Sequence, residues 1–185
     1  MRSLALAGAA LLVAGLVGCS TLIPDPNQPE GEGEPSTAAP ESAAEGVECG
    51  GLTTEDLAGI FGVDLAGPAP STGNSDQNGV TWTSAGCDWE SEDVLEIDLD
   101  ISQGSDFPGG TVTCIEPGGV GDVTAVSSIG SQAWWKFDDF DEIEGELRVC
   151  TADRLVELAV DAESGSMTSD ELLEKVRTAV RIVVG

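Results

Sequence analysis

The sequence predicts an α+β domain in which helices flank a twisted antiparallel sheet. Two patterns carry this prediction. From Val94 to Ser102, apolar and polar residues alternate strictly, as on a strand with one buried face. From Thr168 almost to the end, apolar residues recur at helical spacing. A second, shorter helix is expected before the strands, so the sheet lies between two helices in the chain.

An export signal precedes this domain. Within residues 1–18, the basic residue Arg2 precedes an apolar run of about 14 residues. This run is shorter than the ~20 residues that a membrane-spanning helix needs. The run ends in Leu16-Val17-Gly18-Cys19, which resembles the lipobox of bacterial lipoproteins, where the cysteine takes a diacylglycerol and becomes the new N-terminus. We therefore expect lipid anchoring at Cys19 on the extracytoplasmic face of the cell membrane. The alternative is an ordinary signal peptide whose Cys19 pairs elsewhere or stays free.

The mature chain is strongly acidic. Cleavage after residue 18 removes one basic residue and no acidic one, which leaves six basic against 34 acidic side chains, a net charge of −28. This charge argues against nucleic acid and anionic lipid headgroups as partners, because both would repel it. Cationic partners or metal ions stay possible. The plainer interpretation is a solvated, self-repelling surface suited to a saline habitat.

The chain divides into a leader, a tether and one domain. Residues 19–46 contain five prolines and six acidic residues but no basic one, which predicts a disordered tether. Residues 47–185 are the predicted domain. Four of its residues can form disulfides, and sequence alone allows three connectivities for Cys49, Cys87, Cys114 and Cys150. Zinc is a poor alternative, because the spacing shows no paired-cysteine knuckle and the chain has no histidine.

The first half of the domain begins with a short helix. Thr53 is its expected N-cap and Gly62 its stop. Residues 67–79 are rich in Pro, Ser, Asn and Gly and are expected to form a loop. Two short strands around a turn follow, at residues 80–82 and 86–89, before the alternating strand that starts at Val94.

The second half is expected to hold further strands and the final helix. Residues 104–121 carry turn residues, with a short helix or strand at 111–115. Strands are expected at 123–129 and 132–137, and a hairpin at 147–150 and 155–161. The acidic segment 138–146 is expected to be a turn. It fails the EF-hand pattern because Ile143 occupies the third ligand position and Gly145 comes one residue late, which leaves only a looser calcium site.

The residue types argue against most enzyme classes. Without histidine there is no Ser/His/Asp or Cys/His arrangement, and no nucleophile-elbow or phosphate-binding loop is present. We assign no catalytic residue, cofactor or metal. Trp134 and Lys136 share one face of a strand whose other face carries Ala133, Trp135 and Phe137, so Trp134 and Lys136 are the candidate binding residues. The alternative is that Trp134 is covered and belongs to the core.

Several short features resemble actinobacterial lipoproteins of the domain-of-unknown-function 3558 family. They are the lipobox, Cys49 before a helix ending in Phe61-Gly62, the Cys87-Asp88-Trp89 triplet, Ile129-Gly130 leading into Ala133-Trp134, and the final helix. The resemblance implies a fold like that of PsbP and Mog1 and an actinobacterial source. It also implies a Cys49–Cys87 disulfide, which leaves Cys114 and Cys150 for each other. The family has no established activity or catalytic residues to carry over.

Together these features predict a monomeric, lipid-anchored extracytoplasmic lipoprotein that binds an envelope protein or scaffolds an assembly. One alternative is a carrier for a small apolar or lipid ligand held between sheet and helix. Another is a carboxylate-based hydrolase. A packed core favours protein binding, a large apolar pocket favours the carrier, and two facing carboxylates in a cleft favour the hydrolase.

Overall fold

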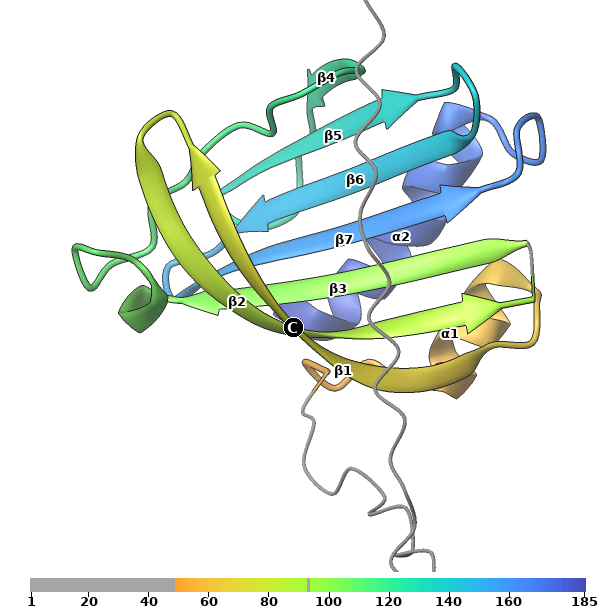
Figure 1. Cartoon of the computed structure of the whole chain (residues 1–185), viewed down its shortest axis with the longest axis horizontal. Helices are drawn as coiled ribbons and strands as arrows, with labels where there is room; N and C mark the ends of the chain where they lie inside the picture. Colours follow the sequence, from red (N-terminus) through yellow and green to blue (C-terminus); the bar gives the residue numbers. More distant parts are fainter. Residues whose placement is uncertain (1–48, 93) are drawn as a thin grey trace, which may run out of the picture. The chain divides into compact units, whose positions relative to one another are not determined.

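The computed structural model describes residues 49–92 and 94–185, so the predicted leader, Cys19 and the tether lie outside the described range. It confirms the α+β class, with seven strands in one antiparallel sheet and two α-helices (Figure 1). A short 3₁₀ turn, η1, covers Gly104–Asp106. The elements are α1 (Thr54–Phe61), β1 (Ala66–Gln77), β2 (Val80–Ser91), β3 (Leu95–Gln103), β4 (Asp122–Ala125), β5 (Gln132–Asp138), β6 (Ile143–Cys150), β7 (Arg154–Ala162) and α2 (Ser169–Val184).

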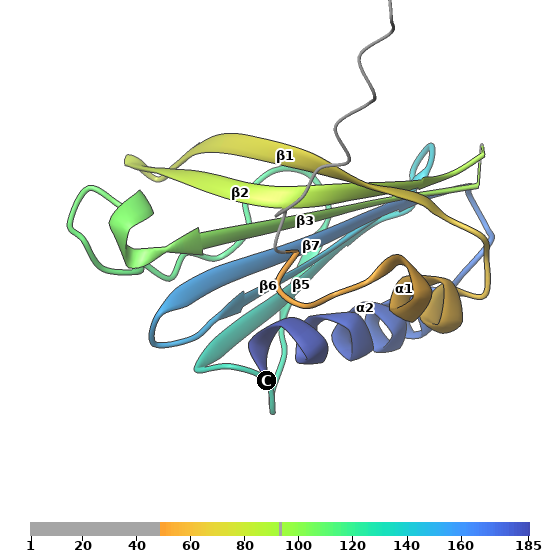
Figure 2. The same ribbon diagram turned by 90° about the horizontal axis from the view of Figure 1, so that it is seen from below.

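Both helices pack on the same face of the sheet (Figure 2). The alternating apolar residues of β3 point toward them, and the apolar side of α2 covers β6 and β7. Gly145 on β6 makes this packing possible, because a side chain there would collide with Trp135 and with Leu172 of α2. The space between sheet and helices is filled by side chains, many of them fully buried.

Each helix starts at a capping box and is held by a core tryptophan. Thr53 and Asp56 cap α1, and Thr168 and Glu171 cap α2. In each helix, the hydroxyl of the first residue then accepts a hydrogen bond from the indole N–H of a tryptophan on the sheet. Nε1 of Trp89 donates to Oγ1 of Thr54 over 3.1 Å, and Nε1 of Trp135 donates to Oγ of Ser169 over 3.0 Å. The predicted N-cap Thr53 and the predicted stop at Gly62 are confirmed.

The strand order β1-β2-β3-β7-β6-β5-β4 divides the sheet into two meanders, β1 to β3 and β4 to β7. They meet where β3 pairs with β7, in a register that runs from Leu95 opposite Ala162 to Gln103 opposite Arg154. The two central partners are thus far apart in the chain, and every other pairing joins neighbours in sequence.

The expectation of a loop at residues 67–79 is wrong, because β1 occupies most of this segment. It lies at one edge of the sheet, where Pro68 and Pro70 can be accommodated because only one side of the strand needs ladder hydrogen bonds. Its side chains are small and polar, and those from Ser71 to Gln77 alternate between half-buried and exposed. The prolines and glycines of this segment therefore led to the prediction of a loop where the structure has an edge strand.

Four further boundaries differ from expectation. The expected turn within residues 80–89 is absent from this described stretch, because β2 is continuous from Val80 to Ser91. Residues 111–115 adopt neither helix nor strand, and β4 ends at Ala125 instead of reaching Ile129. The acidic turn is confined to residues 139–142, since Ile143 already begins β6. For β2, β4 and the acidic turn, strand pairing decides the outcome over local composition.

Both implied disulfides are present. Cys49 pairs with Cys87 and joins the start of the domain to β2. Cys114 pairs with Cys150 and joins the 3₁₀–β4 connection to the end of β6. Each disulfide therefore joins one meander to a segment that flanks it, and neither of the two joins one meander to the other.

Candidate functional site: the helix-free face of the sheet

The face of the sheet opposite the helices carries nearly all of the charged strand residues. We call it the helix-free face, made of the outward side chains of β2, β3, β7, β6 and β5. The register arranges these side chains in rows across the strands. At one end of the strands the rows are apolar, in the middle they surround Arg148, and at the other end they are acidic.

Five carboxylates form one continuous row across the acidic end. Each is directly opposite the next in the ladder, and the order across the sheet is Glu90, Glu96, Asp161, Glu144 and Asp138. We call this set the carboxylate row. Neighbouring strands are ~4.8 Å apart, and like charges directly opposite each other are destabilising. In the described part of the chain, none of the five takes part in an ion pair.

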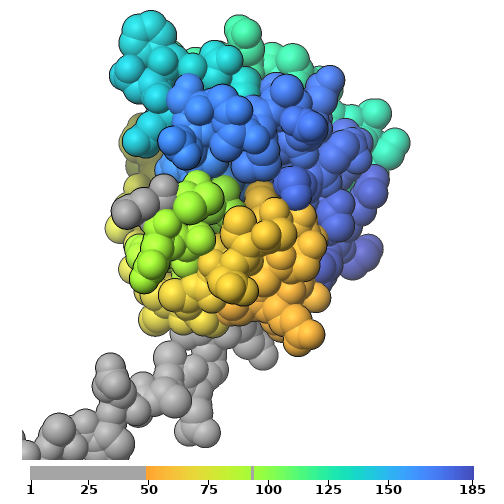
Figure 3. Space-filling view, turned by 90° about the vertical axis from the view of Figure 1, so that its right-hand side faces the viewer, coloured from red at the N-terminus to blue at the C-terminus, as the bar shows by residue number. Residues whose placement is uncertain are grey.

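A hollow of about 790 Å³ continues this row at the strand ends. It is lined by the carboxylates of three row residues and by others from the adjoining turns, namely Glu92, Asp141, Glu142 and Glu163. Two apolar side chains stand at this end. Val94 lines the hollow, and Phe140, at the tip of the β5–β6 turn, is 88% exposed. Figure 3 looks onto this end of the domain, where the β5–β6 turn projects in cyan.

Crowding changes the protonation of the acidic end. Burial, together with the nearby carboxylates of Asp88, Glu96 and Asp161, raises the pKa of Asp98 to about 7. Asp88 lies directly opposite Asp98 in the ladder, so the two carboxyl groups face each other across adjacent strands. Burial and the neighbouring Glu144 and Glu96 also raise the pKa of Asp161. This end of the face therefore takes up protons more readily than isolated carboxylates would.

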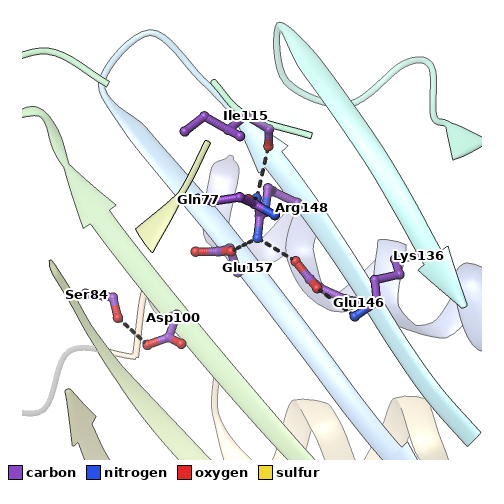
Figure 4. Close-up of polar contacts among 8 residues, drawn as sticks. All are labelled: Gln77, Ser84, Asp100, Ile115, Lys136, Glu146, Arg148 and Glu157. Carbon is purple, nitrogen blue, oxygen red and sulfur yellow. Dashed lines mark hydrogen bonds and ion pairs between the residues drawn. The ribbon is translucent and has the colours of Figure 1, made fainter. Parts of the chain in front are cut away.

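Arg148 is the centre of the middle rows and is only 6% exposed (Figure 4). Its Nη2 lies 2.6 Å from Oε1 of Glu157 and 3.0 Å from Oε1 of Glu146. Its Nη1 donates to Oε1 of Gln77 over 2.6 Å and to the carbonyl of Ile115 over 3.0 Å. The guanidinium also lies 5.8 Å from the ring centroid of Trp82. Arg148 thus joins the sheet to the β1–β2 tip and to the segment before β4.

A second apolar cluster fills the remaining end of the face. Trp82, Leu155 and Cys150 supply its sheet side, and Phe107 and Ile115 cover them from residues 107–121. Phe107 stacks on Trp82 with ring centroids 5.8 Å apart. A hollow of about 570 Å³ adjoins this cluster and is lined by Trp82, Phe107 and short polar side chains of β1, β2 and η1.

The predicted candidate residues lie on this face. Ala133 and Trp135 are buried against the helices, and Phe137 packs against the same core, as the alternation predicts. Trp134 points the other way but is half-buried, because it packs at the margin of the second apolar cluster. Nζ of Lys136 lies 3.8 Å from Oε2 of Glu146. The two residues are therefore neighbours of the Arg148 network, at a distance from the exposed Phe140 turn.

Carboxylates spread along a row do not converge on a point. Among residues 49–92 and 94–185, no group of three or more acidic or cysteine side chains is arranged to hold a metal ion, and this includes the acidic turn. Asp88 and Asp98 face each other across adjacent strands, outside the linings of the two hollows described above.

Sequence reasoning found the charged faces of single strands but missed the row and the Arg148 network. The row joins residues from five strands, and only the register brings them together. One signal in the sequence could have indicated the network. Arg148 is an isolated basic residue within an apolar strand segment, and an arginine at such a position is expected to be buried and paired.

Within the described range, no helix is long and apolar enough to cross a membrane. No protein-family model, curated protein or solved structure matches this chain.

Proposed function

We propose that this chain is a lipid-anchored lipoprotein of the bacterial cell envelope whose domain binds a basic polypeptide segment through the acidic end of the helix-free face. The observation that carries the proposal is the carboxylate row, which makes no ion pair with any residue that the structure describes and lies at the same end of the domain as the exposed Phe140. A basic segment would relieve the repulsion along the row, and Phe140 would supply an apolar anchor.

The packing of the domain favours binding of a protein partner over transport of an apolar or lipid ligand. The space between sheet and helices is occupied by side chains such as Leu147, Leu158, Leu172 and Val176, all fully buried, so a lipid would have to displace the core. Both described hollows are instead open to the surface, and charged or short polar side chains line them beside apolar ones such as Leu95 and Phe107. An exposed, charged sheet face offers the area that a protein partner can cover.

The test measures binding of a defined probe, a fluorescent peptide that combines lysines with leucines, by anisotropy. The row variant Glu96→Gln/Glu144→Gln removes two exposed carboxylates from the row. Its matched control, Glu55→Gln/Glu174→Gln, removes the same charge from exposed positions on the helices. We expect the row variant to weaken binding on the order of tenfold or more, and the control to leave it nearly unchanged.

Phe140→Ala separates apolar anchoring from charge. Because it removes no charge, it should weaken binding at physiological salt while leaving the salt dependence of the affinity unaltered. Equal binding by the wild type, the row variant and the helix variant would contradict the proposal. Binding would then not depend on the carboxylate row and would reflect only the overall negative charge of the protein.

We also propose that the chain is related to the domain-of-unknown-function 3558 lipoproteins and has their PsbP/Mog1-like fold. The Cys49–Cys87 disulfide, the short helix after it and the final helix on the sheet are features that support this kinship. An experimental structure superposed on those folds tests it. A different strand order in the superposition would exclude the relationship.

A further inference from the structure

Residues 107–121, which we call the strap, run without helix or strand across the apolar end of the helix-free face. The strap begins after η1 and ends at β4, so both of its ends are tied to regular structure. Between them it covers the sheet residues Trp82 and Leu155 with Phe107 and Ile115. Beneath the strap lies an apolar surface that is separate from the main core.

Few bonds hold the strap down. Among residues 49–92 and 94–185, the bonds from the strap to the sheet are the disulfide from Cys114 to Cys150 of β6 and the hydrogen bond from Arg148 to the carbonyl of Ile115. The remaining attachment is apolar contact, including the stacking of Phe107 on Trp82. Segments with so few backbone hydrogen bonds open at a lower free-energy cost than strands in the middle of a sheet.

The two disulfides differ in their surroundings. Cys49 and Cys87 are both buried in the main core, Cys87 completely. Cys150 is also buried, whereas Cys114, on the strap, is half-buried and packs at the margin of the second apolar cluster. Cys114 is therefore the least buried of the four disulfide cysteines, and access is one of the determinants of the rate of disulfide exchange.

We propose that the Cys114–Cys150 disulfide is a redox-sensitive fastening for the strap, whose reduction uncovers the apolar end of the helix-free face while the Cys49–Cys87 disulfide keeps the main core closed. The reductant is a dithiol. One of its thiolates attacks Sγ of Cys114, the bond to Cys150 breaks, and Cys150 leaves as a thiolate that takes a proton. The second thiol of the reductant then displaces Cys114. Two electrons pass to the chain, which ends with two thiols, and the reductant ends as a disulfide.

The test treats the full-length protein in detergent with dithiothreitol and alkylates it at intervals before peptide mass spectrometry. We expect Cys114 and Cys150 to be labelled at least about tenfold faster than Cys49 and Cys87. Hydrogen exchange on the same samples should increase in residues 107–121 and stay unchanged in α2. Simultaneous labelling of all four cysteines, or an unaltered strap after selective reduction, would overturn the proposal.

Two variants complete the experiment. Cys114→Ser/Cys150→Ser should fold cooperatively and show the strap exchange of the reduced protein without any reductant. Its matched control, Cys49→Ser/Cys87→Ser, retains the fastening and should keep the slow strap exchange of the oxidised wild type. Loss of cooperative folding in the first variant would also overturn the proposal, because the strap would then be inseparable from the fold.

Discussion

Nη2 of Arg148 lies 2.6 Å from Oε1 of Glu157, and both side chains are largely buried on a face that is otherwise acidic. Burial raises the pKa of Glu157, and Arg148 counteracts that rise. The two Nη atoms of Arg148 meet two carboxylates and two neutral acceptors, whereas its buried Nε has no hydrogen-bond partner among the described residues. Removing one member would leave buried charge without a partner.

Arg148→Leu should therefore destabilise the domain by about 3 to 5 kcal/mol, because Glu157 loses its partner and the strap loses a hydrogen bond. Urea unfolding at neutral pH measures this. Arg148→Leu combined with Glu157→Gln should recover part of the loss, since no buried carboxylate is left unpaired there. Arg181→Leu, at an exposed position on α2, is the control and should cost little. A small effect of Arg148→Leu would mean that water satisfies Glu157.

Stability should fall as pH rises from about 4 to about 7. Asp98 has a pKa of about 7 in the folded protein against 3.8 for the ordinary side chain, so the folded state binds the extra proton in this range. The stabilisation from that proton is present at low pH and is lost as pH rises through 7. Allowing for solvent screening of a half-exposed group, the change is about 1 kcal/mol. Asp98→Asn should flatten the profile of thermal midpoint against pH, and an unchanged slope in this variant would refute the assignment.

Added salt should stabilise the protein. Carboxylates crowded on a compact surface repel each other more than in the expanded chain, and ions screen this repulsion beyond ~10 Å at 0.1 M. Thermal midpoints in low and in molar NaCl check the expectation. The variant Glu96→Gln/Glu144→Gln should respond less than the wild type, whereas a flat response in the wild type would show that the acids are neutralised locally.

Trp134→Ala should cost about 1.5 to 3 kcal/mol of unfolding free energy, because the indole is half-buried at the margin of the second apolar cluster. Trp135→Ala, in the main core, should cost about 3 to 5 kcal/mol and also lose the bond to Ser169. Denaturant unfolding of both variants gives the comparison. Equal losses would place Trp134 in the core and remove it as a binding residue.

Cys19→Ala should move the protein from the membrane to the medium. Lipid chains anchor by ~0.8 kcal/mol per buried methylene, and two chains are needed for a stable hold. Fractionation of cells that express the variant, followed by a salt wash of the membranes, tests this. Retention of the variant on washed membranes would show that Cys19 is not the anchor.

Elements with a strong local pattern could be predicted from the sequence, whereas those defined by pairing could not. The alternation of β3 and the capped apolar stripe of α2 specify their own structure. β1 could not be recognised, because its prolines and glycines suit a loop as well as an edge strand. The candidate site depends on register, which places Glu90, Glu96, Asp161 and Glu144 side by side although they come from four separate strands.

The pairing of β3 with β7 has a consequence for how the chain folds. Each meander can form by contacts between neighbours in sequence, but β3 cannot complete its ladder until β7, the last of the described strands, is available. Contacts between distant segments slow folding, and an exposed strand edge invites wrong pairing. Neither disulfide joins the two meanders, so disulfide formation cannot hold the meanders together before β3 and β7 have paired. We therefore expect the docking of the two half-sheets, after α2 has packed on β6 and β7, to limit the rate of folding.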